Sequence, residues 1–190
     1  IDTITPKSQS NFCPSSDTNL DVALDLVKEN PKLAEDFAKR SLQNGISANF
    51  VAFLQKLREE NPNAADRLFL QSLNQYAQQP TADVYQLLIL GTYLFTSPFA
   101  GNEEVTTFTL TRFGNAGIPN LTANRQGISR MPVRAYLTTV IVTLHRPNSA
   151  SVQRQYKYAL GSLMLPKAQE FAPDLIGAVG GATAAISESI

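Results

Sequence analysis

Few of the residue patterns that mark catalytic sites occur in this sequence of 190 residues. It contains one Cys and one His, so it cannot form an intrachain disulfide or a metal site built from several imidazoles. It also lacks the glycine-rich motifs of hydrolase nucleophiles, phosphate-binding loops and dinucleotide-binding folds. The single imidazole, His145, would need a carboxylate or a nucleophile from another part of the chain to act as a general base.

We expect neither catalytic residues nor a cofactor on these grounds. Two carboxylates one helical turn apart, such as Asp21 and Asp25, resemble the acid–base pairs of glycosidases. On an amphipathic helix, however, such pairs more commonly belong to the solvent-exposed face. An enzyme that lacks a recognisable motif is therefore the last of three hypotheses, and no small-molecule ligand is evident.

The basic residues of the second half form the clearest functional pattern in the sequence. The chain has 16 basic and 16 acidic residues, so its formal net charge is zero. Residues 1–104 nevertheless carry a net charge of −5, residues 105–167 carry +8 with no acidic residue, and residues 168–190 carry −3. A surface made from the middle segment would attract carboxylates or phosphates, because arginine pairs with both through parallel hydrogen bonds.

We interpret the middle segment as an interaction surface. In the leading hypothesis, a non-enzymatic structural or assembly protein docks through an arginine-rich sheet and loop onto an acidic surface of a protein partner or of another copy of itself. In the alternative, a nucleic-acid-packaging or coat-like protein binds phosphates through the same residues. Dedicated nucleic-acid binders usually have denser basic clusters, which favours the first hypothesis. The predicted partner-binding residues are Arg112, Arg125, Arg130, Arg134, Arg146, Arg154, Lys157, Tyr136, Tyr156 and Tyr158.

Apolar residues with helical spacing dominate the first hundred positions. Leu20, Ala23, Leu24 and Val27, for example, lie on one stripe of a helix. Asparagine before proline and Asn44 before glycine supply helix start and stop signals. The patterns predict an amphipathic bundle of about five helices, near residues 18–29, 31–44, 47–60, 62–78 and 81–96.

A short motif recurs in this helical region. Glu29-Asn30-Pro31 is repeated as Glu60-Asn61-Pro62, at an offset of 31 residues that suits a helix-turn-helix repeat. Real repetition would favour a scaffold or binding role, because stacked helical hairpins present surfaces rather than catalytic pockets. The other interpretation is coincidence between two amphipathic helices that share a cap.

The composition changes after Pro98, where Thr, Val and Arg become frequent. Residues 105–113 alternate in polarity, and residues 138–143 are six consecutive β-branched residues, so both segments are predicted to be strands. Residues 152–160 also alternate and are predicted to form a third strand, although a helical stripe fits them too. Residues 114–132 are predicted to be a long loop.

The expected fold is therefore α+β, with an N-terminal amphipathic helical bundle followed by a small antiparallel β-sheet; the alternative is all-α. We expect a flexible N-terminal segment over residues 1–17, a helical region over 18–98, a basic β region over 99–167 and a C-terminal tail over 168–190. No apolar stretch is long enough for a membrane span, so we expect a soluble protein. The start at Ile1 instead of Met predicts processing or truncation, and the compartment remains unknown.

Overall fold

The computed structural model describes residues 18–79, 83–95, 130–147 and 151–187, and helices are the regular structure throughout these ranges. Their α-helices are α1 (Thr18–Leu26), α2 (Pro31–Ser41), α3 (Ala48–Glu60), α4 (Pro62–Gln78), α5 (Val84–Phe95), α7 (Arg130–His145), α8 (Ser151–Phe171) and α9 (Ile176–Ser187). Two short 3₁₀ helices follow α2 and α8, namely η1 (Leu42–Asn44) and η2 (Pro173–Leu175). The five helices predicted for the first half are confirmed, with ends that differ by a few residues.

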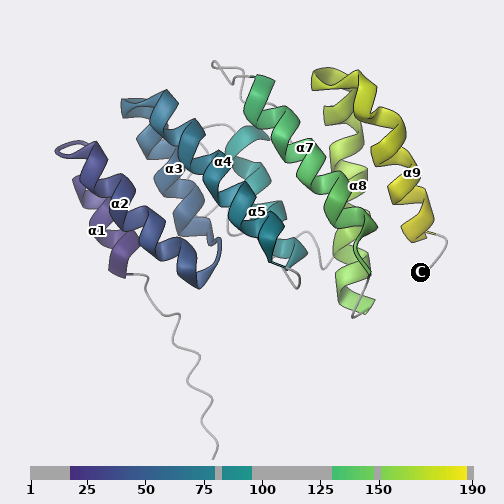
Figure 1. Ribbon diagram of the computed structural model, residues 1–190, viewed down its shortest axis with the longest axis horizontal. Helices are drawn as coiled ribbons and strands as arrows, with labels where there is room; N and C mark the ends of the chain where they lie inside the picture. The colour runs from purple at the N-terminus through teal and green to yellow at the C-terminus, as the bar shows by residue number, and fades with distance from the viewer. Residues whose placement is uncertain (1–17, 80–82, 96–129, 148–150, 188–190) are drawn as a thin grey trace, which may run out of the picture.

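The helices are arranged in two layers (Figure 1). In one layer α1 contacts α3, α3 contacts α5, and α5 contacts α8; in the other, α2 contacts α4, α4 contacts α7, and α7 contacts α9. Between the layers, the helices pack as the pairs α1–α2, α3–α4, α5–α7 and α8–α9, and α8 also contacts α7 while α3 contacts α2. We call this arrangement the helix-pair stack. Because each pair contacts mainly its neighbours, the architecture resembles that of repeat proteins.

The repeated asparagine–proline motif begins equivalent helices of this stack. The side chain of Asn30 accepts a hydrogen bond from the backbone N–H of Leu33 at the start of α2, at 3.1 Å. The side chain of Asn61 accepts one from the N–H of Ala64 at the start of α4, also at 3.1 Å. The backbone angles of the two caps are nearly the same, at −144° and 78° for Asn30 and −150° and 88° for Asn61. The motif therefore marks the same position in two successive pairs.

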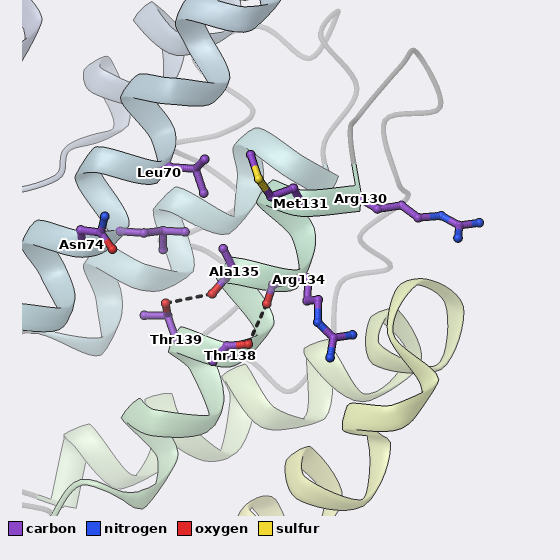
Figure 2. A pocket seen from close by; sticks show the side chains of 9 residues that line it. Leu70, Asn74, Arg130, Met131, Arg134, Ala135, Thr138 and Thr139 are labelled. Carbon is purple, nitrogen blue, oxygen red and sulfur yellow. Dashed lines mark hydrogen bonds between the residues drawn. The ribbon is translucent and has the colours of Figure 1, made fainter.

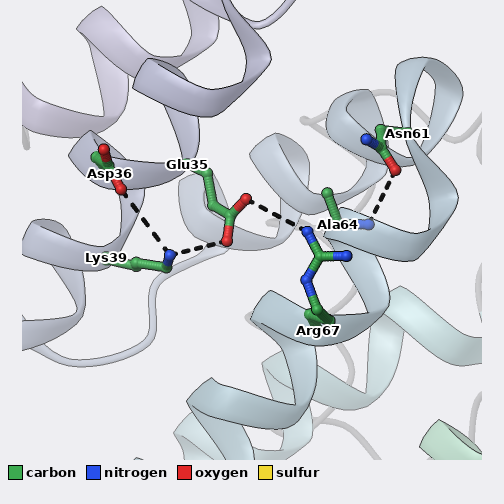
Figure 3. Close-up of polar contacts among 6 residues, drawn as sticks. All are labelled: Glu35, Asp36, Lys39, Asn61, Ala64 and Arg67. Carbon is green, nitrogen blue, oxygen red and sulfur yellow. Dashed lines mark hydrogen bonds and ion pairs between the residues drawn. The ribbon is translucent and has the colours of Figure 1, made fainter.

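An ion-pair cluster joins these two helices on the surface (Figure 3). The carboxylate of Glu35 on α2 lies 2.8 Å from the ammonium of Lys39 on the same helix. It also lies 3.9 Å from the guanidinium of Arg67 on α4. Exposed pairs of this kind contribute little to stability. Lys39 and Arg67 nevertheless compensate the negative charge of Glu35.

Aromatic residues fill the core where α4, α5 and α7 meet. The rings of Phe69 and Tyr93 stack with centroids 4.9 Å apart, and Tyr136 lies 6.4 Å from Phe69 and 5.9 Å from Phe95. Tyr136 is completely buried, and its hydroxyl donates a hydrogen bond of 2.9 Å to the backbone carbonyl of Leu87. Burial of this hydroxyl is therefore compensated, as buried polar groups require.

The predicted antiparallel sheet is wrong for the described residues, because the segment 138–143 lies inside α7. Its threonines satisfy their hydroxyls along the helix: Thr138 donates to the carbonyl of Arg134 at 3.0 Å, and Thr143 donates to that of Thr139 at 2.8 Å. Burial explains why a β-branched sequence becomes helical. The residues that face the core recur with the spacing of a helix, namely Val133, Tyr136, Leu137, Val140 and Leu144. Tertiary packing thus overrides the local preference for strand.

The third predicted strand, residues 152–160, is also wrong, because it forms the first half of α8. The helical stripe, and not the alternating pattern, matches the structure, because Leu160, Leu163 and Met164 are buried along it. The first predicted strand, residues 105–113, and most of the predicted loop 114–132 lie outside the described residues, while residues 130–132 begin α7. The all-α alternative fits the structure.

Close contact between α5 and α7 predicts that Gly91 cannot be enlarged. A Cβ atom on Gly91 would lie 2.3 Å from the hydroxyl oxygen of Tyr136 and 2.8 Å from its Cζ. We expect Gly91→Ala to lower the free energy of unfolding by about 2 kcal/mol, because the buried ring must move. Chemical denaturation followed by circular dichroism measures this change.

Gly181→Ala is the matched control, because nothing lies within 4 Å of a Cβ at this exposed position of α9. It should raise the free energy of unfolding by roughly 0.5–1 kcal/mol through better helix propensity. Equal effects of the two substitutions would contradict the close approach of α5 and α7.

Candidate partner-binding groove between α4 and α7

A groove of about 610 Å³ lies between α4 and α7, in the second layer of the helix-pair stack (Figure 2). One side is formed by α4 with Leu70, Leu73 and Asn74. The other side is formed by α7 with Arg130, Met131, Arg134, Ala135, Thr138 and Thr139. Two helices of neighbouring pairs thus build the groove, and two of the predicted partner-binding residues belong to it.

The inner surface of the groove is apolar. Leu73 is almost fully buried and Leu70 is half-buried, whereas Met131 has 63% of its surface exposed. Figure 2 shows Met131 extending from α7 toward Leu70 on α4. A flexible, polarizable methionine can adapt its shape to an apolar ligand. The groove can therefore bury an apolar side chain of a partner.

The uncharged polar groups of the groove are two threonine hydroxyls and one amide. The hydroxyls of Thr138 and Thr139 each donate to a carbonyl one turn earlier in α7, at 3.0 Å, so only their lone pairs remain available. Asn74 adds an exposed amide. None of the nine lining residues is an acid, a histidine or a cysteine. Within the described part of the lining, the Thr138 and Thr139 hydroxyls therefore have no acid or imidazole beside them to act as a general base.

Two arginines form a basic rim, where their side chains extend away from α4 (Figure 2). Arg130 and Arg134 lie one helical turn apart on α7, so they share a face. Arg134 donates two hydrogen bonds to the carboxylate of Asp174 on η2, at 2.9 and 2.6 Å. These bonds raise the pKa of Arg134 and lower that of Asp174. Arg130 is exposed and forms no ion pair with another of the residues that the structure describes.

Arg146 contacts the end of α4 rather than the groove. Its guanidinium donates hydrogen bonds to the backbone carbonyls of Ala77 and Gln79, at 2.6 and 3.1 Å. It also lies over the ring of Tyr76, 5.8 Å from the centroid. Carbonyls at a helix C-terminus carry partial negative charge and favour such a cation. The side chain therefore joins the end of α7 to the end of α4.

Lys157 has a similar structural role between α7 and α8. It is buried, and its ammonium group donates a hydrogen bond to the backbone carbonyl of Arg146, just beyond the end of α7. Burial lowers the pKa of Lys157, and the positive charge of Arg146 lowers it further. Contacts within the chain thus account for Arg146 and Lys157 without an external binding partner.

The predicted tyrosine anchors are also divided among different environments. Tyr136 is in the core, Tyr156 is half-buried with its ring 6.2 Å from that of Tyr85, and Tyr158 is 42% exposed on α8. Arg154 is half-buried on α8. Arg112 and Arg125 lie outside the described residues. The structure therefore groups Arg130 and Arg134 at the groove and does not collect the whole predicted set on one surface.

Reasoning from the sequence missed the α4 side of the groove, and it missed Met131 and Asp174. A helix over residues 130–145 would have placed Met131 and Arg134 opposite the stripe of Val133 and Val140. Because residues 138–143 are predicted to be a strand, the prediction does not define that helical face. Nothing local in α4 distinguishes Leu70 from other apolar helix positions, because its groove partner lies some sixty residues later.

The candidate groove is not accompanied by a metal site or a membrane helix in the described residues. No group of His, Cys, Asp and Glu there could hold a metal ion. None of the described helices combines the length and the apolar character that crossing a membrane requires. Comparison with protein-family models, curated proteins and solved structures finds no match to this chain.

The contacts of Arg146 predict a structural role that differs from that of Arg130. Arg146→Ala should lower the free energy of unfolding by about 2 kcal/mol, because two carbonyls at the end of α4 lose a charged donor. Arg130→Ala should change it by less than about 0.5 kcal/mol, as expected of an exposed side chain. Urea denaturation of both variants measures the difference. Similar values for the two would contradict the capping role of Arg146.

Proposed function

We propose that this chain is a non-enzymatic assembly protein that binds a segment of a protein partner in the groove between α4 and α7. The observation that carries the proposal is an exposed apolar side chain, Met131, beside an exposed cation, Arg130, on one groove wall; Arg130 forms no ion pair with another described residue. A partner segment with an apolar residue and an adjacent carboxylate matches both features. The apolar group would lie against Leu70 and Met131, and the carboxylate would pair with Arg130.

The surrounding architecture supports this proposal. Stacked helix pairs present extended surfaces formed by successive helices of one layer, which is how repeat proteins bind other proteins. Residues 105–167 lack acidic residues, so α7 itself carries no like charge that would repel an acidic segment. Electrostatic complementarity of this kind increases the association rate and selects among partners.

The nucleic-acid hypothesis has less support from the described residues. Arg146 and Lys157 bind backbone carbonyls of this chain, and Arg134 pairs with Asp174. Phosphate-binding surfaces usually need several cations free to contact the backbone of the nucleic acid. An apolar groove wall also contributes little to phosphate recognition.

Selection of peptides from a random display library tests the groove. With the full chain as bait, we expect enrichment of sequences that combine acidic and large apolar residues. Met131→Gln should weaken the binding of an enriched peptide by about tenfold, because the partner loses an apolar contact worth about 1.4 kcal/mol. Arg130→Gln should weaken peptide binding severalfold at low salt and by a smaller factor at high salt. Fluorescence anisotropy measures the Kd values.

Val142→Gln is the matched control, because Val142 is 50% exposed on the same helix but does not line the groove. Equal weakening by Val142→Gln and Met131→Gln would place the docking site elsewhere. Binding of single-stranded RNA that Arg130→Gln abolishes would favour the nucleic-acid hypothesis. Concentration-dependent self-association in light scattering, abolished by Met131→Gln, would identify the partner as a second copy.

A further inference from the structure

The basic rim of the groove contains one cation that is already occupied from within the chain. Arg134 extends from the second turn of α7, and Asp174 belongs to η2, the connection between α8 and α9. Each terminal nitrogen of the guanidinium donates to one carboxylate oxygen, at 2.9 and 2.6 Å. Arginine recognises a carboxylate of another protein through the same two-bond geometry.

We propose that Asp174 competes with a partner's carboxylate for Arg134 and thereby limits which acidic segments the groove binds. This inference rests on the proposed function, because it concerns the same groove. In the unbound chain, Arg130 forms no ion pair with the other described residues, and the charge of Arg134 is compensated by Asp174. A partner with a second carboxylate, placed one helical turn from the first, binds Arg134 when it displaces Asp174.

Exposure of the pair makes such an exchange feasible. The side chains of Arg134 and Asp174 retain 56% and 55% of their surface. Exposed ion pairs contribute little to folding, because water and salt screen the attraction and both side chains must be ordered. We expect the fold to tolerate loss of this contact, because both side chains are more than half exposed. It occupies Arg134 until a better placed carboxylate is available.

Position also separates this pair from the other acidic contact nearby. The carboxylate of Glu170 on α8 lies 3.9 Å from the ammonium of Lys167, which does not line the groove. The side chain of Glu170 is 54% exposed. Glu170 and Asp174 thus have the same charge and nearly the same exposure, but only Asp174 binds a groove residue. This difference supplies a matched control for the general effect of removing a negative charge.

The test measures the Kd of an enriched acidic peptide for variants of the full chain at low salt. We expect Asp174→Asn to tighten binding by roughly three- to tenfold, because Arg134 no longer has an internal carboxylate partner. Glu170→Gln should change the Kd by less than about twofold. In an Arg134→Gln background, Asp174→Asn should have no effect, since the competing contact is already absent. The gain in affinity from Asp174→Asn should disappear at high salt.

The possible results separate this inference from the proposed function. If the peptide binds and depends on Met131 and Arg130, but Asp174→Asn leaves its Kd unchanged, the groove function stands and the competition is refuted. Weaker binding by Asp174→Asn would also refute it and would show that Asp174 positions Arg134 for the partner. If Glu170→Gln tightened peptide binding equally, the effect would come from the loss of a negative charge in general and not from Asp174. Failure of any peptide to bind the groove would overturn both. Thermal unfolding of each variant excludes loss of fold as the cause.

Discussion

Tyr136 fixes the position of α7, and the groove depends on that position. Its ring is enclosed by aromatic residues of α4 and α5, its hydroxyl donates to a carbonyl of α5, and Gly91 leaves the space that the hydroxyl occupies. A helix with an apolar stripe must bury it against other elements to be stable. Once Tyr136 and Val140 face the core, Met131 and Thr138 are directed to the opposite side, along α4.

The cations of the basic segment serve two purposes that composition cannot distinguish. Arg146 and Lys157 bind carbonyls at or just beyond the ends of α4 and α7, where the helix dipole favours positive charge. Arg130 and Arg134 instead lie at the rim of the groove. The excess of basic over acidic residues is therefore partly structural. Among the cations of this segment that the structure describes, Arg130 and Arg134 are the two that line the groove.

The helix-pair stack gives the proposed function a physical basis. A groove between neighbouring helices of one layer arises from regular packing, and its chemistry is determined by the few side chains that face it. Here the described lining residues offer apolar contact, hydrogen-bond acceptors and positive charge. These are the groups that the proposed partner segment would contact.

The sequence by itself determined the helices of the first half, because their apolar stripes are regular and Asn30 and Asn61 cap α2 and α4. It also located the basic segment that contains Arg130 and Arg134. Tertiary structure alone decided the rest. Thr138 to Thr143 prefer strand locally, yet burial of one helical face outweighs that preference. The groove unites Leu70 with Met131, and the rim pair unites Arg134 with Asp174, across long stretches of sequence. No local pattern encodes such contacts, since they form only when the pairs stack.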